Sequence, residues 1–125
     1  MFYKILIVGL GGSLGSILRF VCVRTIDTKF NSSFPYGTLT VNIVGSFVIG
    51  VVYASVTRKT GGSEYWSLFL GAGLCGGFTT FSAFALENIS LINQKMLGTS
   101  LLYIVLSLSI GLLATGAGIL VGNRL

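Results

Sequence analysis

Hydrophobic and polar residues fall into long blocks along this chain. The apolar blocks cover residues 5–24, 37–57, 64–91 and 97–122, and short polar segments separate them. An α-helix needs about 20 apolar residues to cross the hydrocarbon core of a bilayer. The pattern therefore predicts an all-α integral membrane protein in which residues 1–125 form a single domain of four transmembrane helices.

Composition strengthens this prediction. The chain is 53% hydrophobic and 9% charged, whereas soluble domains carry about 25% charged residues. The basic residues are scattered and mostly flank apolar blocks, which argues against a nucleic-acid partner despite a net charge of +5. The cysteines, Cys22 and Cys75, lie in apolar blocks and are expected to be buried free thiols. The absence of histidine excludes imidazole metal sites and histidine proton relays.

The first apolar block has two competing interpretations. A signal peptide would need a cleavage site of small residues, but none follows, and Arg19 interrupts the block. A dinucleotide-binding turn would need a glycine where Leu14 stands. Gly11 and Gly15 instead fit the G-x-x-x-G spacing that lets membrane helices pack closely.

The third block contains a stretch, Gly71–Phe84, that is unfavourable for a continuous helix. Gly76 adjoins Gly77, and Thr79 adjoins Thr80 shortly afterwards. Glycine weakens a helix interior by about 1 kcal/mol relative to alanine, and threonine is stiff at χ1 and bonds to nearby backbone. The stretch predicts a broken helix. Unpaired backbone groups are expensive in a bilayer, so the break indicates a site where protein, water or an ion takes up the freed groups.

Polar residues recur at helical spacing within the second block. Thr38, Asn42 and Ser46 are four residues apart and therefore share one helix face. An asparagine in a membrane either hydrogen-bonds to a neighbouring helix or donates to a ligand.

The fourth block carries a similar stripe of Thr99, Tyr103, Ser107, Gly111 and Thr115. Its hydroxyls could bond back to carbonyls one turn earlier, with Gly111 admitting a neighbouring helix. Alternatively the stripe is a hydroxyl-lined track for a ligand that needs donors. Its length favours the track.

Aromatic and charged residues flank the predicted break. Phe81 and Phe84 share a face if the helix resumes, and their electropositive ring edges can contact a small anion, although packing is the ordinary role of such rings. Glu87 follows one turn later and is expected at the membrane interface or in a wet vestibule. Arg19 either extends to the interface or holds positive potential near an anion entrance.

Charge gives almost no bias in orientation. With four spans, one side carries Lys4, Arg58, Lys59 and Arg124. The other side carries Arg24, Lys29 and Lys95, with Arg19 as a further candidate. The positive charge of the loops sets the orientation of a membrane protein. Either this small difference in charge is enough to fix one orientation, or the chain inserts in both orientations and forms an antiparallel homodimer.

Three stretches carry a family resemblance. Gly11–Phe20, Gly37–Phe47 and Gly73–Phe84, the last containing GGFTTFSAF, resemble the small bacterial fluoride channels of the Fluc or CrcB family. The resemblance implies a passive, multi-pass channel of the bacterial inner membrane that exports fluoride from the cytoplasm, and not an enzyme. It also implies a dual-topology antiparallel homodimer with two pores.

The resemblance further implies functions for individual residues. Main-chain carbonyls of Gly76 and Thr79 from both subunits would hold a structural Na⁺. The fluoride pore would be lined by Phe81, Phe84, Asn42, Tyr103, Ser107, Thr115, Ser82 and Thr38. Arg19 stays the candidate for an anion entrance.

Two positions depart from the family pattern. Gly111 stands where the track would be expected to carry a hydroxyl, and Ala83 stands where threonine is common. Two other functions compete with this interpretation. A proton-coupled multidrug exporter needs a membrane carboxylate, for which Glu87 is the internal candidate. A non-transporting assembly factor would leave the predicted break unexplained.

Overall fold

The computed structural model describes residues 1–59 and 61–125, and every regular element in this part of the chain is helical. The elements are α1 (Phe2–Phe30), α2 (Tyr36–Val52), the π-helical η1 (Tyr53–Thr57), α3 (Glu64–Ser67), the π-helical η2 (Leu68–Cys75), α4 (Gly76–Phe78), α5 (Phe81–Asn93) and α6 (Leu97–Asn123).

These elements combine into four helices long and apolar enough to span a membrane. They are Phe2–Phe30, Tyr36–Thr57, Glu64–Asn93 and Leu97–Asn123. Each predicted span lies within one of them. The prediction of an all-α protein with four membrane-spanning helices is confirmed.

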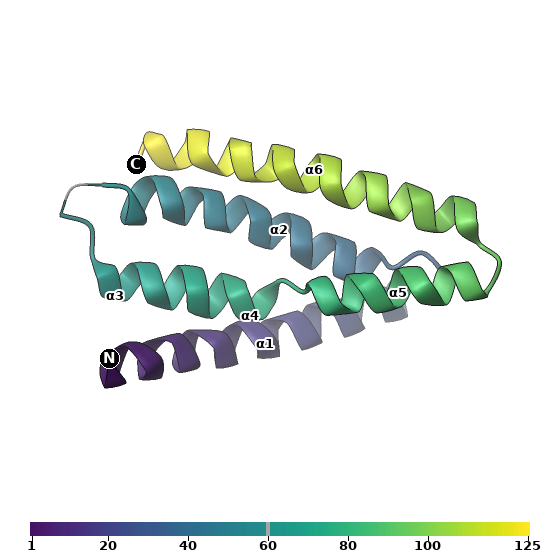
Figure 1. Ribbon diagram of the computed structural model, residues 1–125, viewed down its shortest axis with the longest axis horizontal. Helices are drawn as coiled ribbons and strands as arrows, with labels where there is room; N and C mark the ends of the chain where they lie inside the picture. Colours follow the sequence, from purple (N-terminus) through teal and green to yellow (C-terminus); the bar gives the residue numbers. More distant parts are fainter. Residues whose placement is uncertain (60) are drawn as a thin grey trace.

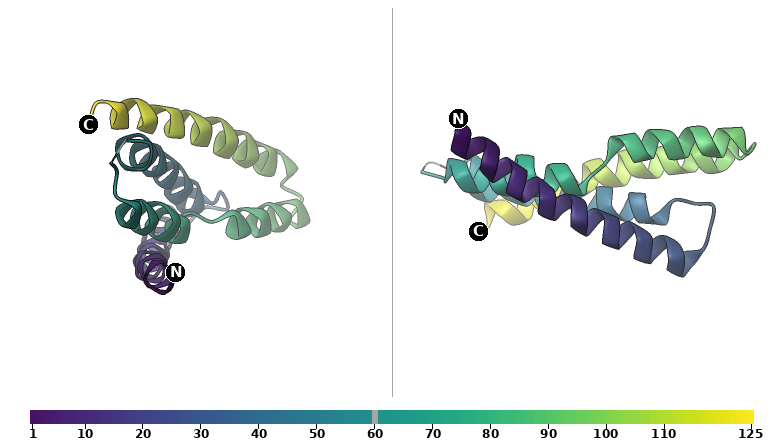
Figure 2. Two further views of the ribbon diagram at one scale, coloured as in Figure 1. Left: turned by 60° about the vertical axis from the view of Figure 1, so that its left-hand side comes forward. Right: turned by 90° about the horizontal axis from the view of Figure 1, so that it is seen from below.

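The four spans run up and down beside one another, and both termini lie at the same end (Figure 1). α2 lies between α6 and the interrupted third span, and α1 packs against the α3–α4 half of that span. Towards the opposite end α5 and α6 stay together while α1 and α2 diverge from them (Figure 2). The bundle therefore opens on the side where the third span resumes as α5.

Glycines allow the close packing between α1 and the third span. A Cβ atom at Gly11 or Gly15 would overlap the carbonyl oxygens of Phe69 and Leu74. The backbones are thus in direct contact, as the G-x-x-x-G spacing predicts. α2 and α6 approach each other in the same way at Gly50 and Gly118.

Polar contacts fix the ends of the spans. The Lys4 Nζ atom lies 2.6 Å from Glu64 Oε1, which joins the start of α1 to α3. At the opposite end of α1, Asp27 Oδ1 accepts a hydrogen bond of 3.0 Å from the amide of Gly37. Between these ends most large side chains of the bundle surface are exposed and apolar, for example Leu112 and Leu113. Such a surface suits lipid or a second membrane chain.

Candidate functional site

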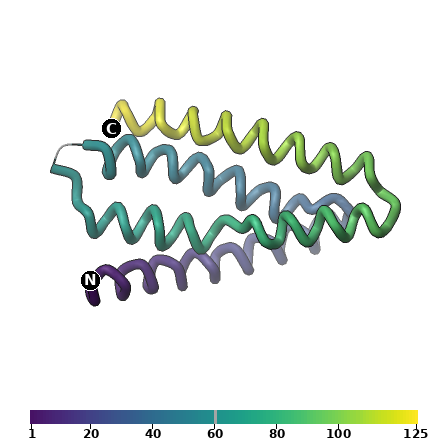
Figure 3. Tube along the Cα trace, in the orientation of Figure 1, coloured from purple at the N-terminus to yellow at the C-terminus, as the bar shows by residue number. Residues whose placement is uncertain are grey.

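The third span is interrupted at Thr79 and Thr80, inside the stretch predicted to break. α4 ends at Phe78 and α5 begins at Phe81, and the two threonines between them have extended backbone, with ψ of 158° and 117°. The trace straightens at this point (Figure 3). The interruption faces the middle of α2.

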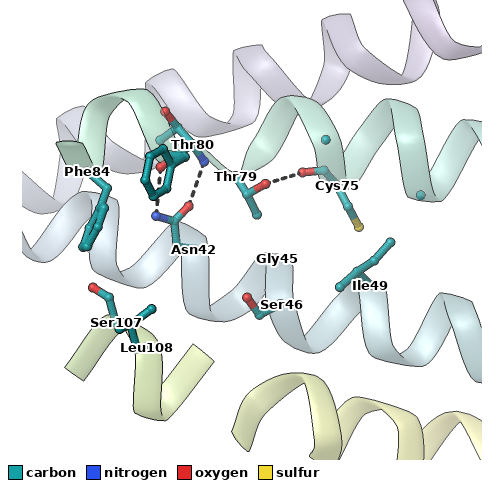
Figure 4. A pocket seen from close by; sticks show the side chains of 13 residues that line it. Asn42, Gly45, Ser46, Ile49, Cys75, Thr79, Thr80, Phe84, Ser107 and Leu108 are labelled. Carbon is teal, nitrogen blue, oxygen red and sulfur yellow. Dashed lines mark hydrogen bonds between the residues drawn. The ribbon is translucent and has the colours of Figure 1, made fainter. Parts of the chain in front are cut away.

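Asn42 on α2 pairs with the interruption. Its Oδ1 accepts a 2.8 Å hydrogen bond from the amide of Thr80, and its Nδ2 donates a 3.1 Å hydrogen bond to the carbonyl of the same residue. Both bonds are drawn in Figure 4. Asn42 was predicted either to bond to a neighbouring helix or to donate to a ligand, and the structure shows the bond to a neighbouring span. One N–H of the amide is engaged in this way, and the second N–H has no hydrogen bond to the part of the chain that the structure describes.

The hydroxyls beside the interruption cap the two half-helices. Thr80 Oγ1 accepts from the amide of Ala83 at 3.1 Å and lies 3.2 Å from Ser82 Oγ. Thr79 Oγ1 donates to the carbonyl of Cys75 at 3.0 Å. The side chain of Thr79 is therefore engaged by its own helix, which leaves its carbonyl as the group available to an ion.

The interruption also frees a carbonyl of the first half-helix. In a continuous α-helix the amide of Thr80 would bond to the carbonyl of Gly76, but Asn42 takes that amide. Carbonyls at an unwound point in a membrane helix are typical ligands of Na⁺. Gly76 and Thr79 both line a cavity between α2, the third span and α6, so their main-chain oxygens are the groups there that could hold a hard monovalent cation.

That cavity has a volume of about 410 Å³ and lies between α2, the third span and α6 (Figure 4). It brings together six of the predicted site residues, namely Asn42, Gly76, Thr79, Phe81, Phe84 and Ser107. Uncharged residues line it throughout. Three separate spans thus contribute to one uncharged recess, whose mostly apolar wall carries a few polar side chains.

One buried donor in the cavity has no partner. Among the described residues, Ser107 Oγ is the buried side-chain polar atom without a hydrogen bond. A buried polar group left unpaired costs about 1–3 kcal/mol. Ser107 lines the cavity from α6, together with Phe84 of α5 and Asn42 of α2 (Figure 4). The hydroxyl of Ser107 is therefore an unsatisfied polar group at the edge of the cavity.

The two phenylalanines that follow the interruption differ in environment. Their ring centroids are 5.6 Å apart, and the Phe84 ring also lies 5.0 Å from that of Tyr103. Phe84 is half-buried, whereas Phe81 is 79% exposed. Phe84 thus belongs to the wall of the cavity, and Phe81 stands at its open side.

Other predicted pore residues are engaged elsewhere. Thr38 Oγ1 donates to Glu87 Oε2 at 2.8 Å, and Tyr103 Oη donates to Glu87 Oε1 at 2.9 Å. Thr115 Oγ1 bonds back to the carbonyl of Gly111 at 3.2 Å. None of these three hydroxyls lines the 410 Å³ cavity. Of the fourth-span residues predicted for the pore, Ser107 is the one that opens into it.

A second cavity lies on the other side of Thr80 and contains Glu87. This cavity, of about 310 Å³, is lined by Arg19, Arg24, Thr38, Thr80 and Glu87 among others. Thr80 borders both cavities, so the two recesses meet at the interruption. The predicted entrance residue, Arg19, lies on this second side and not in the uncharged recess.

Sequence reasoning left the partners of Glu87 unassigned and missed Asn88 and Ser100 altogether. Ser100 donates to Asn88 in the buried contact between α5 and α6. The polar stripe of the fourth span follows a four-residue period from Thr99 and so passes beside Ser100. A search for polar residues at intramembrane depth, without a required period, would have found both.

The molecule is thus a multi-pass membrane protein in which a broken helix lies beside an uncharged recess. A model of the family described as "CrcB-like protein, Camphor Resistance (CrcB)" matches residues 6–119. The chain belongs to this family, as its resemblance predicted.

Named relatives match over nearly their whole length. Proteins named "Fluoride-specific ion channel FluC" are 41% identical over 118 residues in Flavobacterium psychrophilum (94% of this chain, 95% of the relative) and 42% identical over 122 residues in Agrobacterium fabrum (98% of each). A third, from Rhizobium meliloti, is 43% identical over 115 residues (92% of each). The family consists of membrane ion channels and not of enzymes, which agrees with the prediction.

Proposed function

We propose that this protein is a passive, fluoride-selective channel that exports F⁻ from the bacterial cytoplasm across the plasma membrane. The names of its full-length relatives support the choice of ion. The structural observation that carries the proposal is the buried, unpartnered hydroxyl of Ser107 in an uncharged recess.

The recess offers what a dehydrated fluoride ion needs. Fluoride holds its hydration shell strongly, so a narrow membrane path must replace water with hydrogen-bond donors. Ser107 Oγ–H supplies one, and the second N–H of Asn42 supplies another. The edge of the Phe84 ring is electropositive without carrying a full charge. Such donors attract an anion without trapping it, because no cationic side chain lines the recess.

The second cavity supports an anion entrance. Arg19 and Arg24 line it together with one carboxylate, that of Glu87, so the net charge of the lining is positive and would raise the local anion concentration. Thr80 borders both cavities, so the entrance and the recess would adjoin at the interruption. Thr38 and Tyr103, the donors to Glu87, would complete the path if an anion shared them. Selectivity against larger halides then follows from the width of the path.

We further propose an antiparallel homodimer with two pores and a structural Na⁺. Phe81 is highly exposed at the open side of the recess, where a second copy would cover it. The weak charge bias is compatible with insertion in both orientations. Carbonyls of Gly76 and Thr79 from two copies would hold the ion, whose charge would stabilise the interrupted backbone. Ser82, beside Thr80, would contribute a further hydroxyl to the pore.

A cellular experiment tests the proposed function. The protein would be expressed in a bacterium that lacks its own fluoride exporters, with Ser107→Ala as the matched variant. We expect the wild-type chain to raise the tolerated concentration of external fluoride and the variant to do so less. An unchanged tolerance, with the protein demonstrably in the membrane, would contradict the proposal.

A further inference from the structure

A buried polar pair joins α5 and α6 outside the recess. Ser100 Oγ donates a 2.8 Å hydrogen bond to Asn88 Oδ1, and the two residues are 0% and 7% exposed. Neither of them lines the cavity that holds Ser107. The pair therefore cannot contact an ion there, and its effect on the site must be indirect.

Asn88 also bonds to the backbone of Phe84, a predicted pore residue. Its Nδ2 donates a 2.9 Å hydrogen bond to the carbonyl of Phe84, one turn earlier on α5. The side chain thus bridges Ser100 on α6 and the main chain of Phe84 on α5. The Phe84 ring in turn lies 5.0 Å from the ring of Tyr103, one turn beyond Ser100.

The bridge determines the register of the two helices. α5 and α6 are antiparallel neighbours joined by the short segment 94–96. Apolar packing alone allows one helix to shift along another in discrete steps. A buried asparagine and serine are both satisfied in one register, because a shift would leave unpaired groups in an apolar surrounding. The pair therefore selects one alignment.

The alignment of α5 and α6 determines which residues of α6 lie beside Phe84. Ser107 follows Ser100 by two helical turns and so lies on the same side of α6. With the Asn88–Ser100 pair formed, Phe84 and the free hydroxyl of Ser107 line one recess. We infer that Asn88 and Ser100 are positioning residues that hold the Phe84 ring against the Ser107 hydroxyl in the anion path. The inference rests on the proposed function for its effect on transport.

Two substitutions of Ser100 separate the effect of its hydrogen bond from the effect of its side-chain volume. Ser100→Ala removes the donor, and Ser100→Thr keeps it. In wild type and both variants, Phe84 would be replaced by 4-fluorophenylalanine to record the ¹⁹F NMR signal of its ring. Fluoride efflux from liposomes would be measured on the same set with native Phe84.

We expect Ser100→Thr to keep the wild-type ¹⁹F signal and an efflux rate within about twofold. Ser100→Ala should shift or broaden the signal and reduce efflux by about tenfold or more, since a loss of about 1.4 kcal/mol in anion binding is a tenfold change in affinity. If Ser100→Ala does not fold, Ser100→Cys replaces it, because a thiol of similar size is a weak donor. The elution profile of each purified variant checks its assembly.

The outcomes distinguish the two proposals. A wild-type protein without fluoride efflux would contradict the proposed function, while the ¹⁹F signal would still report on the position of Phe84. Equal signals and equal efflux for wild type and Ser100→Ala would overturn the positioning role. Equal losses in Ser100→Ala and Ser100→Thr would also overturn it, since volume and not the hydrogen bond would then be responsible.

Discussion

Asn42 pairs with both backbone groups of Thr80, accepting from its amide at 2.8 Å and donating to its carbonyl at 3.1 Å. One side chain on α2 thus replaces the partners that a continuous helix would have supplied to a residue 38 positions away. This pairing lets the third span break inside an apolar bundle. It also places the amide of Asn42 at the edge of the recess.

Replacing Asn42 with leucine should destabilise the protein and abolish fluoride efflux. The substitution leaves an amide and a carbonyl of Thr80 unpaired, and each such group costs about 1–3 kcal/mol. The free energy of unfolding in detergent, measured by titration with SDS, would record the loss. Thr40→Val, at an exposed residue of α2 that bonds only to Tyr36, is the control and should change stability by less than about 0.5 kcal/mol. Similar stability of the two variants would contradict this assignment.

Ser107→Ala should affect transport and stability in opposite directions. The variant removes an unpartnered buried hydroxyl, so stability should be unchanged or increase by about 1 kcal/mol. Fluoride efflux should fall by about tenfold, corresponding to the loss of a contact worth about 1.4 kcal/mol. Ser107→Thr, which keeps the hydroxyl, is the matched variant. Unreduced efflux in Ser107→Ala would show that this hydroxyl is not part of the path.

The blocks of apolar residues were sufficient to predict the four spans, because span length is fixed by bilayer thickness. The double glycine followed by threonines predicted a break within Gly71–Phe84, and the structure has it at Thr79 and Thr80. The partners of Glu87 could not be predicted, since Thr38 lies 49 positions away and the contact arises only when α2 and α5 pack together. The partner of the Asn42 side chain could not be predicted either. That partner is the backbone of Thr80, and backbone groups leave no pattern in the sequence.

The stripe on the fourth span shows a further limit of periodicity. Equal spacing put Tyr103, Ser107 and Thr115 on one face, but their neighbours differ along the helix. Tyr103 meets Glu87, Thr115 bonds to its own helix, and Ser107 meets a cavity. The π-helical segments η1 and η2 were not predicted either, because no residue period in these segments distinguishes them from α-helix.

Gly76→Val should weaken the dimer and its dependence on Na⁺, whereas Thr79→Ser should not. Within one chain a Cβ atom at Gly76 meets nothing closer than 3.8 Å, the carbonyl oxygen of Gly71. Damage from valine would therefore come chiefly from a facing partner or ion. Serine at 79 keeps the hydroxyl that donates to Cys75. The dimer fraction, measured by cross-linking in Na⁺ and in N-methyl-D-glucamine buffers, records both effects. Equal damage from the two substitutions would contradict the assignment, because Thr79→Ser keeps the carbonyl and the hydroxyl and loses only a methyl group.

An antiparallel dimer requires both orientations in the membrane. Cys22 and Cys75 would be replaced by serine or alanine, and a single cysteine added after Leu125. A membrane-impermeant thiol reagent applied to intact cells should label about half of the protein, and the rest should react only after the cells are opened. Labelling that is complete, or absent, in intact cells would contradict dual topology.

The most direct measurement is the efflux of fluoride compared with that of chloride from liposomes containing the purified protein, in Na⁺ buffer. A K⁺ gradient with valinomycin would drive either anion. If the uncharged recess around Ser107 is a fluoride path, F⁻ should leave rapidly while Cl⁻ leaves no faster than from protein-free liposomes. Absence of F⁻ efflux, or Cl⁻ efflux as fast as that of F⁻, would contradict the proposed function.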